Sequence, residues 1–297
     1  MMFLKNVLKD RVAAASFAIL VAVMTVGIFA PVFAPHDPEE VHMELRYASA
    51  SWEYWLGNDH LGRCILSRLI YGIQPSVLGV LAALLLSVLL GAVIGFVAGY
   101  FRGKTDVILM RICDVMLSFP SYVMTLAVVG IFGVGLEHIL MAFLLLKWAW
   151  FARIIRTSVM QFSESDYVKF AKVAGVGNAA IMRKHLIPAA LPDIAVIASS
   201  SFGSMVLQIS GFSFLGLGIQ APKAEWGMML NEAREVMFSK PEFMLAPGLA
   251  IIIVVLAINF LSDAFQAAVD PKLAASSRKE RSMAEAAAGR LERKEVA

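Results

Sequence analysis

The stretch Tyr167-Val-Lys-Phe-Ala-Lys-Val-Ala-Gly-Val-Gly177, continued by His185-Leu-Ile-Pro-Ala-Ala-Leu-Pro192, decides how this sequence is interpreted. It is polar and basic, contains two closely spaced glycines and two prolines, and lies between strongly apolar runs. Most connections between apolar runs are short, whereas this one extends over residues 156–189. The length and the helix signals of the connection favour a folded docking surface outside the apolar part of the chain.

The local signals of the 156–189 connection predict two short helices. The segment Ser163-Glu-Ser-Asp166 offers Ser and Asp as N-caps and places acid where a helix N-terminus favours it. A first helix from about Tyr167 to Ala174 is expected to stop at Gly175, because glycine suits the left-handed position after a helix. A second helix from about Ala179 is expected to end near Pro188, because proline disfavours helix at the preceding residue.

The composition places the chain among membrane proteins. It is 59% hydrophobic and 16% charged, whereas a soluble domain is roughly half apolar. Several continuous apolar runs reach the about 20 residues that cross a bilayer as a helix, and none alternates like a barrel strand. The net charge of +3 gives no indication of a nucleic-acid partner. An all-α polytopic membrane protein is therefore expected.

Six apolar spans are predicted. The first follows Lys5, Lys9 and Arg11 and could be a signal peptide, but it is longer than the roughly 7–15 apolar residues of one, and Pro35 follows it. An uncleaved first span is therefore favoured. The expected spans cover residues 12–33, 76–100, 108–131, 136–155, 190–212 and 245–268.

Charge separates the connections into two sets. Cations concentrate near residues 101–107, in the 156–189 connection and in the C-terminal tail, whereas residues 35–75 are acidic. Because positively charged connections stay in the cytoplasm, both termini are expected there and residues 35–75 outside. The predicted divisions are a cytoplasmic N-terminus (1–11), a transmembrane domain (12–272) and a solvated polar cytoplasmic tail without assigned function (273–297).

Polar residues within the spans have two interpretations. They line a pathway if polar groups at depth face water, or they let helices pack closely. Both interpretations stay open, whereas Gly91, Gly95 and Gly99, at four-residue spacing, favour packing. The candidate lining residues are Ser118, Ser121 and Met124 in the third span, and Ser201, Ser204 and Gln208 in the fifth, which also contains Ser199 and Ser200.

No catalytic, cofactor or metal site is predicted. Residues 98–105 nearly spell a phosphate-binding loop, but Ala98 replaces its first glycine and a membrane span, not a strand, precedes it. No histidine has another His or Cys at close metal-ligand spacing, so we expect surface histidines. Cys64 and Cys113 are too far apart in sequence to indicate a disulfide framework or thiolate cluster. Asp114 is expected to pair with Arg111.

Together these segments, from about residue 5 to 272, resemble the permeases of ABC importers of the dipeptide, oligopeptide and nickel family, in particular the second permease subunit. In the 156–189 connection the family motif falls on Ala171, Gly175 and Pro188, while Lys169 and Phe170 depart from it. Further matching segments are Leu56-Gly-Asn-Asp-His-Leu-Gly-Arg63 with Ser67-Arg-Leu69, Met110-Arg-Ile-Cys-Asp114 with Phe119-Pro120, and Ser213-Phe-Leu-Gly-Leu-Gly218 with Glu225-Trp-Gly227.

The resemblance implies a type I ABC importer permease fold of six transmembrane helices in the cell inner membrane, surrounded by lipid. It implies a partner permease, two cytoplasmic ATPase subunits that hydrolyse the ATP, and an extracytoplasmic binding protein. The 156–189 connection becomes a coupling loop that docks on an ATPase, with Val168, Phe170, Ala171, Val173 and Ala174 as its apolar contacts. The coupling residues it implies are Tyr167, Val168, Lys169, Phe170, Ala171, Ala174, Gly175, His185 and Pro188.

The cargo and the transport class leave alternatives. The runs Trp148-Ala-Trp-Phe-Ala-Arg153 and Ala221-Pro-Lys-Ala-Glu-Trp-Gly227 look more like nickel-type than dipeptide-type members, so nickel or a nickel chelate is expected, with short peptides as the alternative. A secondary transporter would need mid-span acids and an inverted repeat, and the sequence shows neither. An intramembrane enzyme would need a catalytic constellation, which is also missing.

Overall fold

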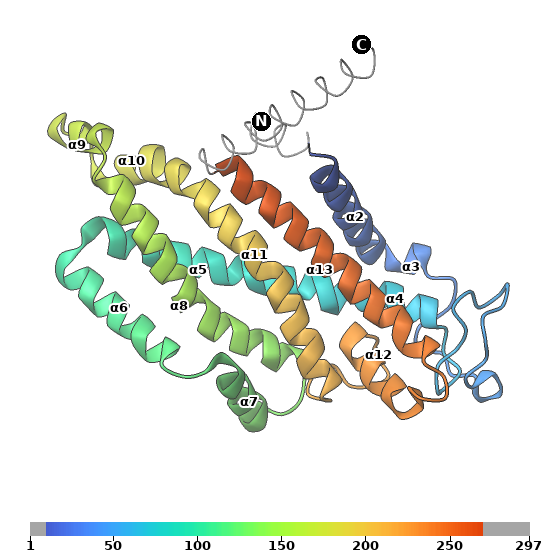
Figure 1. The fold of residues 1–297 in the computed structure, drawn as a ribbon. Helices are drawn as coiled ribbons and strands as arrows, with labels where there is room; N and C mark the ends of the chain where they lie inside the picture. The colour runs from blue at the N-terminus through green and yellow to red at the C-terminus, as the bar shows by residue number, and fades with distance from the viewer. Residues whose placement is uncertain (1–9, 270–297) are drawn as a thin grey trace, which may run out of the picture.

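The computed structural model describes residues 10–269 (Figure 1). The predicted tail, residues 273–297, and most of the predicted N-terminus, residues 1–11, lie outside this range. The described residues form helices and no β-strand, which confirms the all-α class. The main helices are α2 (Arg11–Ile28), α3 (Ala30–Phe33), α4 (Ile65–Ile73), α5 (Val80–Phe101), α6 (Gly103–Leu117), α7 (Ser121–Phe132), α8 (Leu136–Ser163), α9 (Asp166–Val173), α10 (Asn178–Ile181), α11 (Ile187–Phe214), α12 (Trp226–Ala233) and α13 (Glu242–Val269).

Five helices in the described range are long and apolar enough to cross a membrane, and the number is six if a bent pair of helices is counted as one span. The bent pair is α6 and α7, whose axes differ by 76°. The six predicted spans therefore correspond to five continuous helices and one broken one. The continuous helices cover Arg11–Ile28, Ile65–Phe101, Leu136–Ser163, Asn178–Phe214 and Glu242–Val269.

The third span is not the straight helix that was predicted over residues 108–131. Helix α6 ends at Leu117, and α7 begins at Ser121 after Pro120. Proline has no N–H to donate and disfavours helix at the residue before it, here Phe119. The hydroxyl of Ser118 donates to the carbonyl of Val115 at 2.7 Å and closes α6. The break follows from these local preferences.

Prolines in three other spans do not break the helix, and they include Pro192 of α11 and Pro247 of α13. The helix over Asn178–Phe214 continues through Pro188, so the prediction of a second short helix ending near Pro188 is wrong. A π-helical turn over Met182–Leu186 precedes this proline, and another over Gln74–Gly79 contains Pro75. A widened turn shifts the carbonyl that the proline ring would otherwise strike, which lets the helix continue.

Helices α5 and α8 pack against each other through three glycines of α5. A β-carbon on Gly91, Gly95 or Gly99 would lie 2.8, 2.7 or 2.8 Å from the carbonyl oxygens of Trp148, Ala152 and Arg156, respectively. These separations are shorter than real contacts of a β-carbon. The prediction that this glycine series serves packing is confirmed.

Replacing Gly95 with Ala is expected to lower the thermal unfolding midpoint of the purified protein in detergent. The added methyl group must push α5 away from α8, and such overpacking costs about 1–3 kcal/mol. Gly130→Ala in α7 is the matched control, because a β-carbon there meets no atom within 4 Å. Equal midpoints for the two variants would contradict the packing role.

The remaining helices lie at the two opposite ends of the molecule or between them (Figure 1). Helices α11 and α13 run side by side, and α2 packs against α13. Helices α9 and α10 lie at one end, while α12 and the connection from Ala34 to Cys64 lie at the other. We refer to these as the α9–α10 end and the α12 end.

Candidate functional site

Helix α9 ends at Val173, and Gly175 takes the left-handed position just after it, as predicted. Gly175 has a φ of +78°, and its N–H donates to the carbonyl of Lys172 at 3.1 Å. The N–H of Val176 donates to the carbonyl of Ala171 at 3.0 Å, which completes the paired bonds of a Schellman turn. Ser165 is the N-cap residue, but its hydroxyl donates back to Phe162 instead of capping α9. The turn at Gly175 fixes the direction in which the chain enters α10.

The apolar residues of α9 divide between two faces. Val168 is fully buried and Ala171 is buried, so these two residues of the predicted contact set pack against the chain itself. Phe170 and Val173 are 75% and 87% exposed, and Tyr167 is also exposed. We call Tyr167, Phe170 and Val173 the exposed face of α9. It leaves large apolar side chains uncovered by the described chain.

The other predicted coupling residues lie around this face. Lys169, Ala174, Gly175 and Pro188 are exposed, and His185 is half-buried. The rings of His185 and Tyr167 have centroids 6.0 Å apart, which brings the start of α9 to the turn that follows α10. The predicted residues thus form one local surface, apart from the two buried ones.

The C-terminal end of α5 holds this surface in place. The hydroxyl of Tyr100 donates to Oδ1 of Asn178 at 2.8 Å, and the ammonium of Lys172 lies 4.9 Å from the Tyr100 ring centroid. Tyr100 thereby contacts both α9 and α10. The sequence offered no signal for this, since the partners are far apart along the chain.

Arg102 makes the second set of contacts. It pairs with Glu164 at 2.6 Å and donates to the carbonyl of Met160 at 3.1 Å and to the hydroxyl of Ser163 at 3.0 Å. A cation at these last carbonyls of α8 is favoured by the helix dipole. Arg102 has a φ of +54°, a conformation disfavoured for residues with a side chain. We call Tyr100 and Arg102, with their partners, the loop clamp.

Lys169, which departs from the family motif, is paired within the chain. Its ammonium lies 3.2 Å from Glu164. Hydrogen bonds from Lys169 and then from Arg102 hold the pKa of Glu164 below its usual range. The ionised form is therefore favoured, and the pairs weaken only as the pH falls through that lowered pKa. The pairing joins α9 to the loop clamp.

The predicted pathway residues do not all face the same way. Ser201 is buried, and its hydroxyl donates to the carbonyl of Ile197, which is a packing role. Ser204 is exposed and Gln208 half-buried. At the break between α6 and α7, Ser118 and Ser121 are exposed, and Met124 is half-buried. The rings of Tyr122 and Phe212, with centroids 5.5 Å apart, bring α7 to α11.

Ion pairs join α6 to α8. Arg111 lies 3.9 Å from Asp114, which confirms the predicted local pair. Arg153 of α8 also hydrogen-bonds Asp114, and Arg156 of α8 pairs with Asp106. No spacing in the sequence indicates these longer-range partners, although they place α6 alongside α8.

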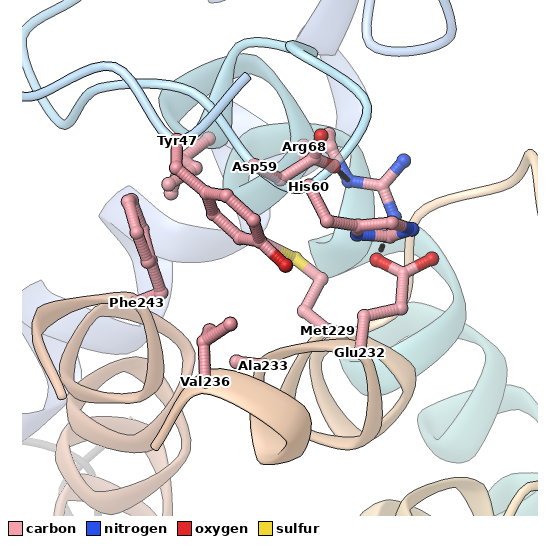
Figure 2. Close-up of a pocket in the computed structure, with 10 residues that line it drawn as sticks. Tyr47, Asp59, His60, Arg68, Met229, Glu232, Ala233, Val236 and Phe243 are labelled. Carbon is pink, nitrogen blue, oxygen red and sulfur yellow. Dashed lines mark hydrogen bonds and ion pairs between the residues drawn. The ribbon is translucent and has the colours of Figure 1, made fainter. Parts of the chain in front are cut away.

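A buried charge cluster joins two distant segments at the α12 end (Figure 2). Arg63 and Arg68 are fully buried, and their guanidinium groups donate to the two carboxylate oxygens of Glu232 at 3.0 and 2.9 Å. Both also reach the carbonyl of Pro222, at 3.4 and 3.1 Å. Asp59 accepts from Nε of Arg63 at 2.7 Å. The cluster ties the start of α4 to α12.

His60 lies beside this cluster, and ligand atoms of Asp59, His60 and Glu232 are within 4.8 Å of one another (Figure 2). The carboxylates already face two buried guanidinium groups, whose charges balance theirs. A cation would have to displace those hydrogen bonds. We assign no metal to this group. The spacing of Asp59 and Arg63 was a local signal for their pair, but Glu232 had none.

Comparison with known proteins decides the family. Residues 91–275 match the binding-protein-dependent transport system inner membrane component, and residues 2–49 match the N-terminal transmembrane domain of oligopeptide transport permease C. The chain belongs to this family of ABC importer permeases. The resemblance inferred from the sequence is thereby confirmed, and the permease is a multi-pass membrane transport subunit.

Relatives of this permease are named for several cargoes. It is 55% identical to the metal-staphylopine import system permease protein CntC of Staphylococcus aureus, over 94% of this chain and 96% of that one. It is 37% identical to the nickel transport system permease protein NikC of Escherichia coli, over 80% and 86%. It is 34% identical to the dipeptide transport system permease protein DppC of Alkalihalophilus pseudofirmus, over 91% and 88%.

Proposed function

We propose that this permease imports a metal cargo, nickel or a related metal in complex with a small organic molecule. The supporting observation is its 55% identity to the metal-staphylopine import permease over nearly the whole of both chains. The nickel permease supports the same cargo class at 37% identity. The dipeptide permease, at 34% identity, supports peptide import as the second candidate by the same mechanism.

The α9–α10 end is proposed to face the cytoplasm and to dock on an ATPase subunit. Its support is the basic 156–189 connection, which favours the cytoplasmic side, and the exposed face of α9, which offers Phe170 and Val173 to a partner groove. Both termini then lie in the cytoplasm. The α12 end lies outside and receives cargo from a binding protein. The assembly has a second permease and two ATPases.

The pathway is proposed to run between this chain and the second permease. Ser204 and Gln208 of α11 support this, since the described chain leaves them partly uncovered at membrane depth. The same pathway is proposed to be lined also by residues around the break between α6 and α7, namely Ser118, Ser121 and Met124. Ser201 is not proposed as a lining residue, because it faces the packed side of α11.

The test is uptake of labelled nickel, with and without chelator, by cells that lack this chain. Complementation with the wild-type gene is expected to restore nickel uptake, while a labelled dipeptide measured in parallel stays at background. If only dipeptide uptake were restored, the cargo would be a peptide and not a metal. Restoration of nickel uptake after depletion of cellular ATP would contradict an ATP-driven importer.

A further inference from the structure

Helix α11 has one polar face that the described chain does not cover. Ser200, Ser204 and Gly211 are exposed on it, Gln208 is half-buried, and Leu207 interrupts it as an exposed apolar side chain. The opposite face, with Phe202, Met205 and Ile209 among its residues, is buried in the core. A face exposed to lipid would be apolar, so a polar uncovered face at this depth indicates water or another subunit.

Asp193 lies on this same helical face, closer to the α9–α10 end. Its spacing from Ser200, Ser204 and Gly211 places all four within a narrow stripe at 3.6 residues per turn. Asp193 makes no hydrogen bond or ion pair with any of residues 10–269. Asp193 stands near the start of the predicted fifth span, where no sequence pattern indicates a functional role.

Asp193 lines an open cavity. Its volume is about 260 Å³. The ends of α8, α11 and α13 that border it all belong to the α9–α10 half of the molecule (Figure 1). Its lining residues are Ser158, Asp193, Val196, Ile197, Gln266 and Val269. A hydroxyl, an amide and a carboxylate without a partner among residues 10–269 thus share one cavity.

The chemistry of the cavity favours a cation. An unpaired carboxylate within a span is expensive unless it faces water or a positive charge, and such residues commonly mark substrate paths. The oxygen atoms of Asp193, Ser158 and Gln266 are hard donors, which suit hydrated or partly coordinated metal ions. A single carboxylate holds a cation weakly enough for release, as conduction requires.

We propose that Asp193 and its cavity form a transient binding site for the positively charged or metal-bearing part of the cargo, at the inner end of the pathway. The inference rests on the proposed function, because it requires metal cargo that leaves at the α9–α10 end. It adds a residue that selects cationic cargo after the binding protein has released it.

Uptake of labelled nickel separates this inference from the proposed function. Asp193→Asn is expected to lower initial uptake at subsaturating nickel about tenfold, the scale of one partly screened charge interaction, and Asp193→Glu is expected to restore much of it. Asp263→Asn, at an exposed carboxylate of α13 outside the cavity, is the control and is expected to match wild type. Absence of wild-type uptake defeats the proposed function, whereas wild-type uptake unchanged by Asp193→Asn overturns only the inference.

A second measurement tests the negative charge of the cavity independently of cargo uptake. Ser158→Cys introduces a thiol into the cavity of the assembled transporter in membrane vesicles, where native Cys64 and Cys113 are buried. A cationic methanethiosulfonate is expected to react there several-fold faster than an anionic one, and Asp193→Asn is expected to remove the preference. No reaction at residue 158, or a preference unchanged by Asp193→Asn, would overturn the inference. The inference would also be overturned if the Asp193→Asn chain no longer copurified with the partner permease, because Asp193 would then be an interface residue.

Discussion

Replacing Gly175 with Glu is expected to reduce cargo uptake more than tenfold while the chain stays in the membrane. Gly175 has a φ of +78°, where a residue with a side chain is strained by about 1 kcal/mol. A β-carbon there meets no atom within 4 Å, so the fold itself tolerates the change. The new side chain and the altered turn would both disturb the surface proposed to enter the ATPase groove.

The control for this variant is Gly177→Glu. Gly177 is equally open, but its φ of −64° is ordinary for any residue. It introduces the same charge nearby without changing the turn, so it is expected to keep most of the uptake. Uptake and membrane content, from immunoblots of the same cells, are measured together. Equal uptake by the two variants, or loss of Gly175→Glu from the membrane, would refute the role given to this turn.

Replacing Glu232 with Ala is expected to destabilise the α12 end by about 3–5 kcal/mol, because it leaves buried guanidinium charge without a partner. Arg63 and Arg68 each lose a hydrogen bond, and both are fully buried. The thermal unfolding midpoint of the purified complex in detergent is expected to fall by several degrees, and the amount of protein in membranes with it.

Glu235→Ala is the matched control, since Glu235 is exposed on the next turn of the chain. It is expected to leave the midpoint unchanged, as surface substitutions do. A variant that removes the cations together with the anion, Arg63→Met with Arg68→Met and Glu232→Met, is expected to recover part of the loss. If the Glu232→Ala and Glu235→Ala variants have the same thermal unfolding midpoint, the buried cluster contributes no stability.

The sequence predicted those features whose causes are local. Apolar runs indicated the spans, and a single glycine indicated the end of α9, because each depends on neighbouring residues. The burial of Val168 and the pairing of Arg63 with Glu232 depend on residues from other elements. No periodicity or spacing in the chain indicates such partners, so these parts of the site needed the structure.

The effect of proline on the helices likewise depends partly on neighbouring residues and partly on the rest of the structure. Pro120 lies at a helix break, but Pro188 lies within a continuous helix. The preference of the residue before a proline is the same at both positions. A π-helical turn precedes Pro188, whereas Pro192 and Pro247 lie inside α-helix without one, so the sequence around a proline does not by itself indicate a break.

The loop clamp has a consequence for engineered chimeras. Asn178, Lys172 and Glu164 belong to the loop. The groups that hold them, Tyr100 and Arg102, come from the C-terminal end of α5, far earlier in the chain. A loop grafted alone from another permease would arrive without its own anchors and would rest on mismatched ones. Retargeting this subunit to a foreign ATPase would therefore require transplanting two separate stretches as a matched set.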